Sequence, residues 1–197
     1  MTNKTRCAWV TSDPIYIDYH DREWGVPIYD KKRLFEFLIL EGAQAGLSWI
    51  TVLKKRAQYR KSFDQFDPRK IAVYDESKIK ELLAESGIIR NRLKIQAAIT
   101  NAQAYLALQD SHTDFAEYLW QFVDGKPKQH HWQHSKQIPV SDAASDAMAK
   151  DLKKRGFKFV GTTICYAFMQ AVGMVNDHVT TCFRHPEITS LVQSRYL

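Results

Sequence analysis

Apolar side chains recur at the spacing of a helix along most of this chain, and that periodicity restricts its fold more than any other feature. Leu34, Leu38 and Glu41 mark one such stripe, because residues three and four apart share a helix face. The other stripes occupy residues 49–63, 95–106, 115–122 and 162–175. Few segments alternate with the two-residue period of a strand. The sequence therefore predicts an all-α fold whose last strong helix ends near residue 175.

One long stretch between these helices is expected to be irregular. Residues 125–139 are polar and rich in His, Gln and Lys, which indicates a loop. Three histidines are expected to be exposed there: His130, His131 and His134. Ser141 or Ser145 is expected to cap the helix that follows.

The length of 197 residues suits one domain. We expect a helical core at 31–173, with a hairpin at 150–165, between the terminal segments 1–30 and 174–197. No apolar leader opens the chain, and no apolar run approaches the ~18 residues that a membrane helix needs. These features predict a cytoplasmic protein with no membrane partner.

The charge balance is basic, since 28 Lys and Arg residues against 22 Asp and Glu give a net charge of +6. This charge fits either a polyanionic partner or a mildly basic protein without one. The three cysteines are an odd number in a chain without a secretion signal. They argue against a disulfide framework and leave room for metal ligation.

A basic corner joins the two helices expected around residues 150–165. Gly156 ends the first helix and Gly161 opens the second, where free N–H groups favour a phosphate. This corner resembles the helix-hairpin-helix motif of DNA repair glycosylases, which grips phosphate without reading sequence. The alternative is a glycine-closed corner with solvated lysines. The expected phosphate contacts are Lys153, Lys154, Lys158, Gly161 and Thr162.

Two Cys–His pairs lie near opposite ends of the chain. His178 and Cys182 stand four residues apart, which on a helix places both on one face. Cys7 and His20 form the second pair. Each pair taken alone is better explained without a metal, with Cys7 as a small apolar residue and His20 as a surface or capping residue. Together they supply two thiolates and two imidazoles, a closed tetrahedral set suited to one structural zinc ion per chain. Cys165 is expected to be buried and inert.

Glu41 continues the apolar stripe of its helix and therefore points toward the core. A buried carboxylate is costly without partners. It is either a helix-end group bonded to backbone or Arg, or an acid kept to bind a ligand in an apolar pocket. Aromatic residues are usually core, but an aromatic set with one buried acid is what an extruded base needs. The first quarter of the chain supplies Trp9, Tyr16, Tyr19, Trp24 and Trp49.

Six runs of sequence resemble the DNA-3-methyladenine glycosylase I family: RCAWV, YHDREWGVP, EGAQAGLSWITVLKKR, GIIRNRLKIQA, KKRGFKFVGTTICY and VNDHVTTC. The resemblance covers nearly the whole chain. It implies a helix-hairpin-helix glycosylase fold, a structural zinc joining the terminal segments, and a pocket for 3-methyladenine flipped out of double-stranded DNA. Free 3-methyladenine is then the product ligand, and we expect a bacterial protein that acts as a monomer.

The resemblance also implies roles for individual residues. The zinc ligands are Cys7, His20, His178 and Cys182. The polar contacts to the base are Glu41, which is also assigned the catalytic role, and Tyr19. The stacking partner is Trp49, and the pocket wall is Tyr16, Trp9 and Trp24.

Two departures from the wider superfamily limit the chemistry. Lyases of that superfamily carry a nucleophilic Lys shortly after the hairpin glycine, where this chain has Thr162 and Thr163. Three cysteines are also too few for an iron–sulfur cluster with four cysteine ligands. The sequence therefore predicts a monofunctional glycosylase. The general base is left open between Glu41, Asn176 and Asp177.

Two other classes of protein share some of these features. A non-enzymatic helix-hairpin-helix DNA-binding module explains the charge and the hairpin, but not Glu41 on an apolar stripe. A zinc hydrolase needs an open coordination position, whereas a set of two Cys and two His is closed.

Overall fold

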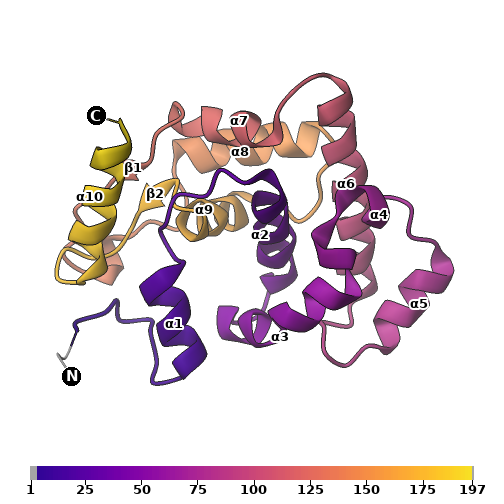
Figure 1. The fold of residues 1–197 in the computed structure, drawn as a ribbon, viewed down its shortest axis with the longest axis horizontal. Helices are drawn as coiled ribbons and strands as arrows, with labels where there is room; N and C mark the ends of the chain where they lie inside the picture. The colour runs from indigo at the N-terminus through magenta and orange to yellow at the C-terminus, as the bar shows by residue number, and fades with distance from the viewer. Residues whose placement is uncertain (1–3, 197) are drawn as a thin grey trace.

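The computed structural model describes residues 4–196, and helices dominate it (Figure 1). The prediction of an all-α fold is therefore confirmed in its main part, because the described residues are mostly helical. Its α-helices are α1 Pro14–Arg22, α2 Lys31–Gln44, α3 Trp49–Ser62, α4 Pro68–Ile71, α5 Glu76–Ala84, α6 Arg92–Asp110, α7 Phe115–Trp120, α8 Ala143–Lys154, α9 Thr162–Ala171 and α10 Arg184–Tyr196. Residues 1–3 and 197, at the outer ends of the predicted terminal segments, lie outside the described residues. Among the helices described, none is long and apolar enough to cross a bilayer.

Helix α2 is the central element of the core and packs against α3, α6, α7 and α9 (Figure 1). Every residue from 34 to 43 is buried, so the helix is surrounded on all sides. Its C-terminal end is held by α6, where the Lys94 ammonium donates to the carbonyls of Ala43 and Ala45 at 2.7 Å each. This central position places Glu41, one turn from the helix end, in apolar surroundings.

Aspartate caps begin several helices. Asp67 caps α4 with Pro68 at the first helical position, a pairing that pre-organises a helix start. The expected Ser141 or Ser145 cap of α8 is wrong. Asp142 is the cap, and it accepts from the Ser145 N–H at 2.7 Å while its own N–H donates to the Ser145 hydroxyl at 2.9 Å. This reciprocal pair satisfies two backbone donors that a serine cap alone would leave free.

A tight corner connects α8 to α9, which pack against each other. Gly156 has a φ of +92°, and Phe159 also has positive φ, at +54°. Asn101 on α6 hydrogen-bonds to the backbone of this corner. Its side-chain amide donates to the Lys158 carbonyl at 3.1 Å and accepts from the Lys158 N–H at 2.7 Å. The backbone of the predicted hairpin is therefore fixed by a buried side chain.

The described residues also contain elements that the sequence does not predict. Two short strands, β1 Lys128–Gln129 and β2 Val175–Asn176, pair in parallel, and β1 lies inside the expected loop region. Three 3-10 turns also occur: Asp64–Phe66, Gln121–Val123 and Ser135–Gln137. Helix α10 follows the last predicted helix. Strands of two residues are too short to show alternation, which explains why they are missed.

The expectation of an exposed His130 is wrong. Its ring is half-buried, and Nδ1 lies 2.6 Å from the Asp177 carboxylate. His131 and His134 are exposed as predicted, and the His131 ring also lies near that of His185, with centroids 5.3 Å apart. The pairing of β1 with β2 brings the loop histidines close to the C-terminal segment. No pattern in the sequence around these histidines predicts that contact.

Candidate functional site

Four side chains from opposite ends of the chain form a buried cluster. The ligand atoms of Cys7, His20, His178 and Cys182 all lie within 4.8 Å of one another. Nδ1 of His178 is 3.6 Å from the Cys7 sulfur and 3.5 Å from the Cys182 sulfur, and Nε2 of His20 is 3.4 Å from the Cys182 sulfur. Tetrahedral zinc, with bonds of ~2.3 Å to sulfur and ~2.0–2.1 Å to nitrogen, separates S and N by about 3.5 Å. The cluster therefore has the spacing of a metal site.

The rings of the cluster are oriented by partners behind them. The far nitrogen of His20 bonds to Asp21 at 2.8 Å, and Asp21 is in turn held by Arg6 at 2.7 Å. The far nitrogen of His178 donates to the Trp24 carbonyl at 3.1 Å. Such outer partners fix the tautomer and the aim of a ligating imidazole. Both near nitrogens consequently face the two sulfurs.

One premise about this cluster is wrong. His178 and Cys182 do not lie on a helix but in the turn between β2 and α10, which the Cys182 N–H closes by donating to the Val179 carbonyl at 2.8 Å. A tight turn brings residues four apart together as a helix does. The spacing thus identifies the pair, while the element it implies is different.

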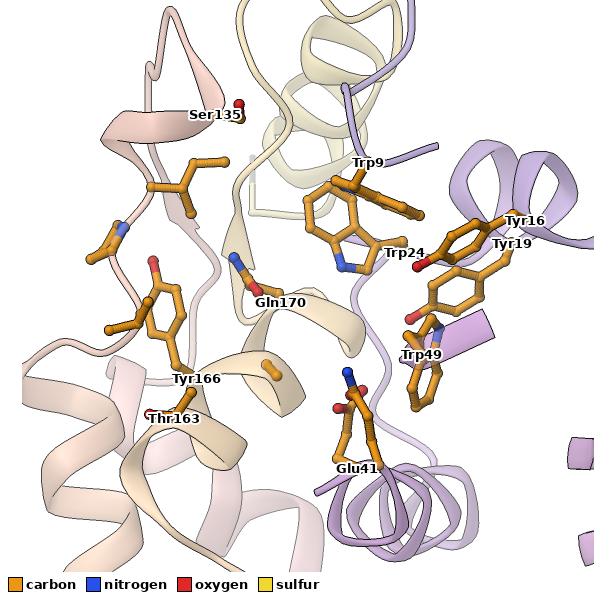
Figure 2. A pocket seen from close by; sticks show the side chains of 15 residues that line it. Trp9, Tyr16, Tyr19, Trp24, Glu41, Trp49, Ser135, Thr163, Tyr166 and Gln170 are labelled. Atoms are coloured by element: carbon orange, nitrogen blue, oxygen red, sulfur yellow. The ribbon is translucent and has the colours of Figure 1, made fainter. Parts of the chain in front are cut away.

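A pocket of about 380 Å³ opens beside this cluster, between α1, α2, the start of α3 and α9 (Figure 2). The structure brings together every residue that the sequence assigns to the base, and all of them line this pocket: Trp9, Tyr16, Tyr19, Trp24, Glu41 and Trp49. The metal cluster and the pocket share a boundary, because the Trp24 ring lies 4.6 Å from the His178 ring and also lines the pocket.

The aromatic wall is held by ring-to-ring packing. Trp9 contacts Tyr16 and Trp24 with centroid distances of 5.0 and 5.1 Å, and Tyr19 contacts Trp49 at 5.5 Å. The rings are tilted or edge-on to each other, and all five of these side chains border the pocket (Figure 2). The wall therefore offers stacking surfaces that are already in place.

Glu41 reaches into this pocket from α2 (Figure 2), and only 4% of its surface is exposed. Burial raises the pKa of its carboxyl to about 8. Burial, and to a lesser extent the nearby Glu41, also raises the pKa of Tyr16 and Tyr19. Electrostatic interactions are stronger in such a pocket than in water, so a cation bound beside Glu41 would lower the pKa of this carboxyl and favour its carboxylate form, with the proton released to solvent.

The sequence misses the opposite half of the pocket. Gln44 lies on α2 three residues after Glu41, so the two residues are neighbours on one helix face. This spacing is the one sequence signal that could have found Gln44. Four side chains of α9 line the far wall: Thr163, Tyr166, Ala167 and Gln170. The loop before α8 completes it with Ser135, Ile138, Pro139 and Val140. Nothing local in the sequence connects α9 or this loop to α2.

Neither Asn176 nor Asp177 is among the residues that line the pocket. The Asn176 side chain donates to the side chain of Gln129 at 2.9 Å and to the carbonyl of His185 at 3.2 Å. Asp177 is 1% exposed and accepts four hydrogen bonds. Burial opposes its ionisation, but these four donors outweigh burial and hold the pKa of Asp177 below its usual value.

The basic corner adjoins the pocket through the first turn of α9, since Thr163 lines the pocket. Lys153, Lys154 and Lys158 are exposed around the corner. The Thr162 hydroxyl already donates to Asp146 on α8. Phosphate contacts at this helix start are therefore left to backbone N–H groups and to the lysines.

The family model for methyladenine glycosylase matches residues 9–185. DNA-3-methyladenine glycosylase 1 of Escherichia coli (strain K12) is 57% identical over 181 residues, covering 92% of this chain and 97% of that protein. A crystal structure of 3-methyladenine DNA glycosylase I has a TM-score of 0.91 at 60% identity, covering 92% of this chain and all of that one. The Staphylococcus aureus enzyme, whose structure describes 3-methyladenine recognition, has a TM-score of 0.89 at 39% identity, covering 92% and 96%.

Proposed function

This chain belongs to the methyladenine glycosylase family, and on that premise we propose that it removes 3-methyladenine from alkylated double-stranded DNA. The observation that carries the proposal is Glu41, a buried carboxyl facing a pocket walled by aromatic rings. A flipped cationic base needs rings that stack on it and an acid that accepts its N–H groups. Both are supplied here by residues of one chain, which supports a monomer, and we place it in the bacterial cytoplasm.

The main task of the enzyme in this reaction is to select the methylated base, and acid–base catalysis is a smaller requirement. An adenine methylated at N3 is cationic in DNA, so its glycosidic bond is weak and the base departs neutral. Trp49 stacks on the base while Glu41 and Tyr19 hydrogen-bond to it. Three further rings form the wall: Tyr16, Trp9 and Trp24. Water attacks C1′ of the sugar through an oxocarbenium-like transition state, and the products are free base and an abasic site.

Incubation with methylated duplex DNA is expected to release free 3-methyladenine and leave an unbroken abasic strand. Because Thr162 and Thr163 follow Gly161, no amine is available there to form a Schiff base, and borohydride is expected to trap no enzyme–DNA adduct. Chromatography of the released base and a denaturing gel measure the two outcomes. Absence of released 3-methyladenine contradicts the activity, and a trapped adduct contradicts the monofunctional assignment.

The Cys–His cluster is proposed to hold one structural zinc ion. Its two thiols and two imidazoles are the donors that zinc prefers, and their S–N spacings of 3.4–3.6 Å fit tetrahedral bonds. All four positions are protein ligands, so the ion joins the terminal segments of a single helical unit. It also supports the pocket, because Trp24 lies against His178.

The corner between α8 and α9 is proposed to be a helix-hairpin-helix that grips DNA phosphates. Charge reversal at Lys153 and Lys154 is expected to weaken binding to damaged and undamaged duplexes alike. It should also reduce the slope of log affinity against log salt by up to ~2, about one for each lost phosphate contact. Fluorescence anisotropy across a salt series measures the slope.

A matched control for the hairpin reverses two exposed lysines elsewhere, Lys32 on α2 and Lys80 on α5. The net charge then changes equally, but no phosphate contact is removed. If the two double variants lower the salt slope equally, the effect belongs to net charge and the hairpin assignment is wrong.

A further inference from the structure

Asp177 occupies the point where the far wall of the pocket meets the β1–β2 region. Its Oδ2 accepts from the Tyr166 hydroxyl at 2.8 Å and from the Gln170 amide nitrogen at 2.7 Å. Its Oδ1 accepts from the Trp132 indole at 2.8 Å and lies 2.6 Å from His130 Nδ1. Two of these partners, Tyr166 and Gln170, line the pocket, and the other two do not.

This arrangement determines which atoms the wall presents. Asp177 accepts in both of these contacts, so it takes up the nitrogen of the Gln170 amide and the hydrogen of the Tyr166 hydroxyl. The Gln170 carbonyl oxygen and a lone pair of the Tyr166 oxygen are what remain for a ligand. Figure 2 shows both side chains on the wall facing Glu41. The pocket therefore has hydrogen-bond acceptors on two opposite sides.

We propose that Asp177 is a positioning residue that sets the hydrogen-bonding polarity of this wall, so that it accepts from a purine amino group and disfavours a carbonyl there. The inference rests on the proposed function, in which the ligand is 3-methyladenine. A carbonyl placed against Gln170 and Tyr166 would leave acceptors facing one another without a donor. Such unpaired polar contacts discriminate more strongly between ligands than differences of size do.

Asp177→Asn makes a directional prediction. The Trp132 indole is only a donor, so it holds the carbonyl oxygen of the substituted side chain and turns the new amide nitrogen toward the pocket side. Gln170 must then offer its own oxygen to that nitrogen, and its nitrogen turns into the pocket. The wall gains a donor where it had an acceptor.

The test compares two free bases by calorimetric titration: 3-methyladenine, and the same methylated purine with a carbonyl in place of the amino group at C6. The wild type is expected to prefer the amino compound by about tenfold or more. Asp177→Asn is expected to lower that ratio by about tenfold. A ratio of affinities reports polarity, since a purely structural defect would weaken both ligands together.

Two further variants keep the test decisive if Asp177→Asn folds poorly. Gln170→Leu removes the amide and is expected to lower the same ratio. Adding Asp177→Asn to Gln170→Leu is expected to lower the ratio by less than Asp177→Asn does alone, because only the Tyr166 hydroxyl remains to be reoriented. Trp132→Phe removes a donor to Asp177 outside the pocket and is expected to leave the ratio unchanged. An unchanged ratio in Gln170→Leu overturns the inference, as does an unchanged ratio in folded Asp177→Asn. Failure of the wild type to bind 3-methyladenine would instead contradict the proposed function.

Discussion

Replacement of Cys182 by alanine is expected to release the metal and to lower the free energy of unfolding by about 3 kcal/mol or more, near 10 °C in Tm for a chain of this size. The reason is that Cys7, His20 and His178 would remain buried and facing one another without the ion that we propose joins them. Elemental analysis should find about one zinc per wild-type chain and much less in the variant. Thermal unfolding measures the loss of stability.

Cys165→Ala is the matched control for this variant. Cys165 is also fully buried, and burial raises its pKa to about 12, so it behaves as a small apolar side chain. Its replacement should cost only a modest packing energy and keep the metal. Wild-type zinc content and Tm in Cys182→Ala would show that the cluster is not a metal site.

Glu41→Gln is expected to reduce the affinity for free 3-methyladenine by roughly one to two decades. An N–H group of the bound base favours the carboxylate form of Glu41, and the amide cannot replace the resulting charge-assisted hydrogen bond, worth about 1.5–3 kcal/mol. The amide keeps the shape of the carboxyl, so undamaged DNA should bind as before. Glu36→Gln on the same helix is the control. Glu36 is also buried but pairs with Arg60 at 2.8 Å and does not line the pocket. Equal base affinity in wild type and Glu41→Gln would make Glu41 structural.

The same substitution should change how stability depends on pH. The pKa of Glu41 is raised in the folded protein from the ordinary 4.5 to about 8. Below pH 4.5 the carboxyl is protonated in both states and costs nothing. As the pH rises toward 8, the unfolded chain loses this proton and the folded chain keeps it, so the wild type loses stability. Gln has no such proton, so its stability relative to wild type should rise by a few kcal/mol between about pH 5 and 8.

Denaturant unfolding of both proteins at the two pH values measures this difference. A stability difference that stays constant across that range would show that Glu41 titrates normally and is not sealed in the pocket. Together with the affinity measurement, the result separates the cost of burying the acid from its use in binding.

The sequence predicts the half of the site whose residues are recognisable from their spacing along the chain. Glu41 is found because an acid interrupts an apolar stripe, and the cluster is found because two Cys and two His residues stand in two pairs. The far wall is different. Tyr166 and Gln170 lie on a segment whose sequence predicts a helix and a hairpin, but nothing in it indicates a pocket. Their relation to Glu41 depends on the packing of α2 against α9, which no spacing within either helix encodes.

The errors in the fold have a similar origin. Helix α10 buries Ile188 and Val192 among mostly polar residues, so it lacks the broad stripe that marks α2. His130 has no carboxylate near it in sequence, yet it bonds to Asp177 across 47 positions. Contacts of that kind arise when two loops meet, and periodicity carries no information about them.

The distance along the chain between the two halves of the metal cluster has a consequence for synthesis. Cys7 and His178 meet across 171 residues. A ribosome adds ~5–20 residues per second, so the first two ligands are exposed on the order of ten to thirty seconds before their partners exist. During that interval they offer an ion only half of its coordination shell. We therefore expect the helical core to fold first on the nascent chain and the metal to bind last. The ion would then stabilise a chain that has already folded, and it would not initiate folding.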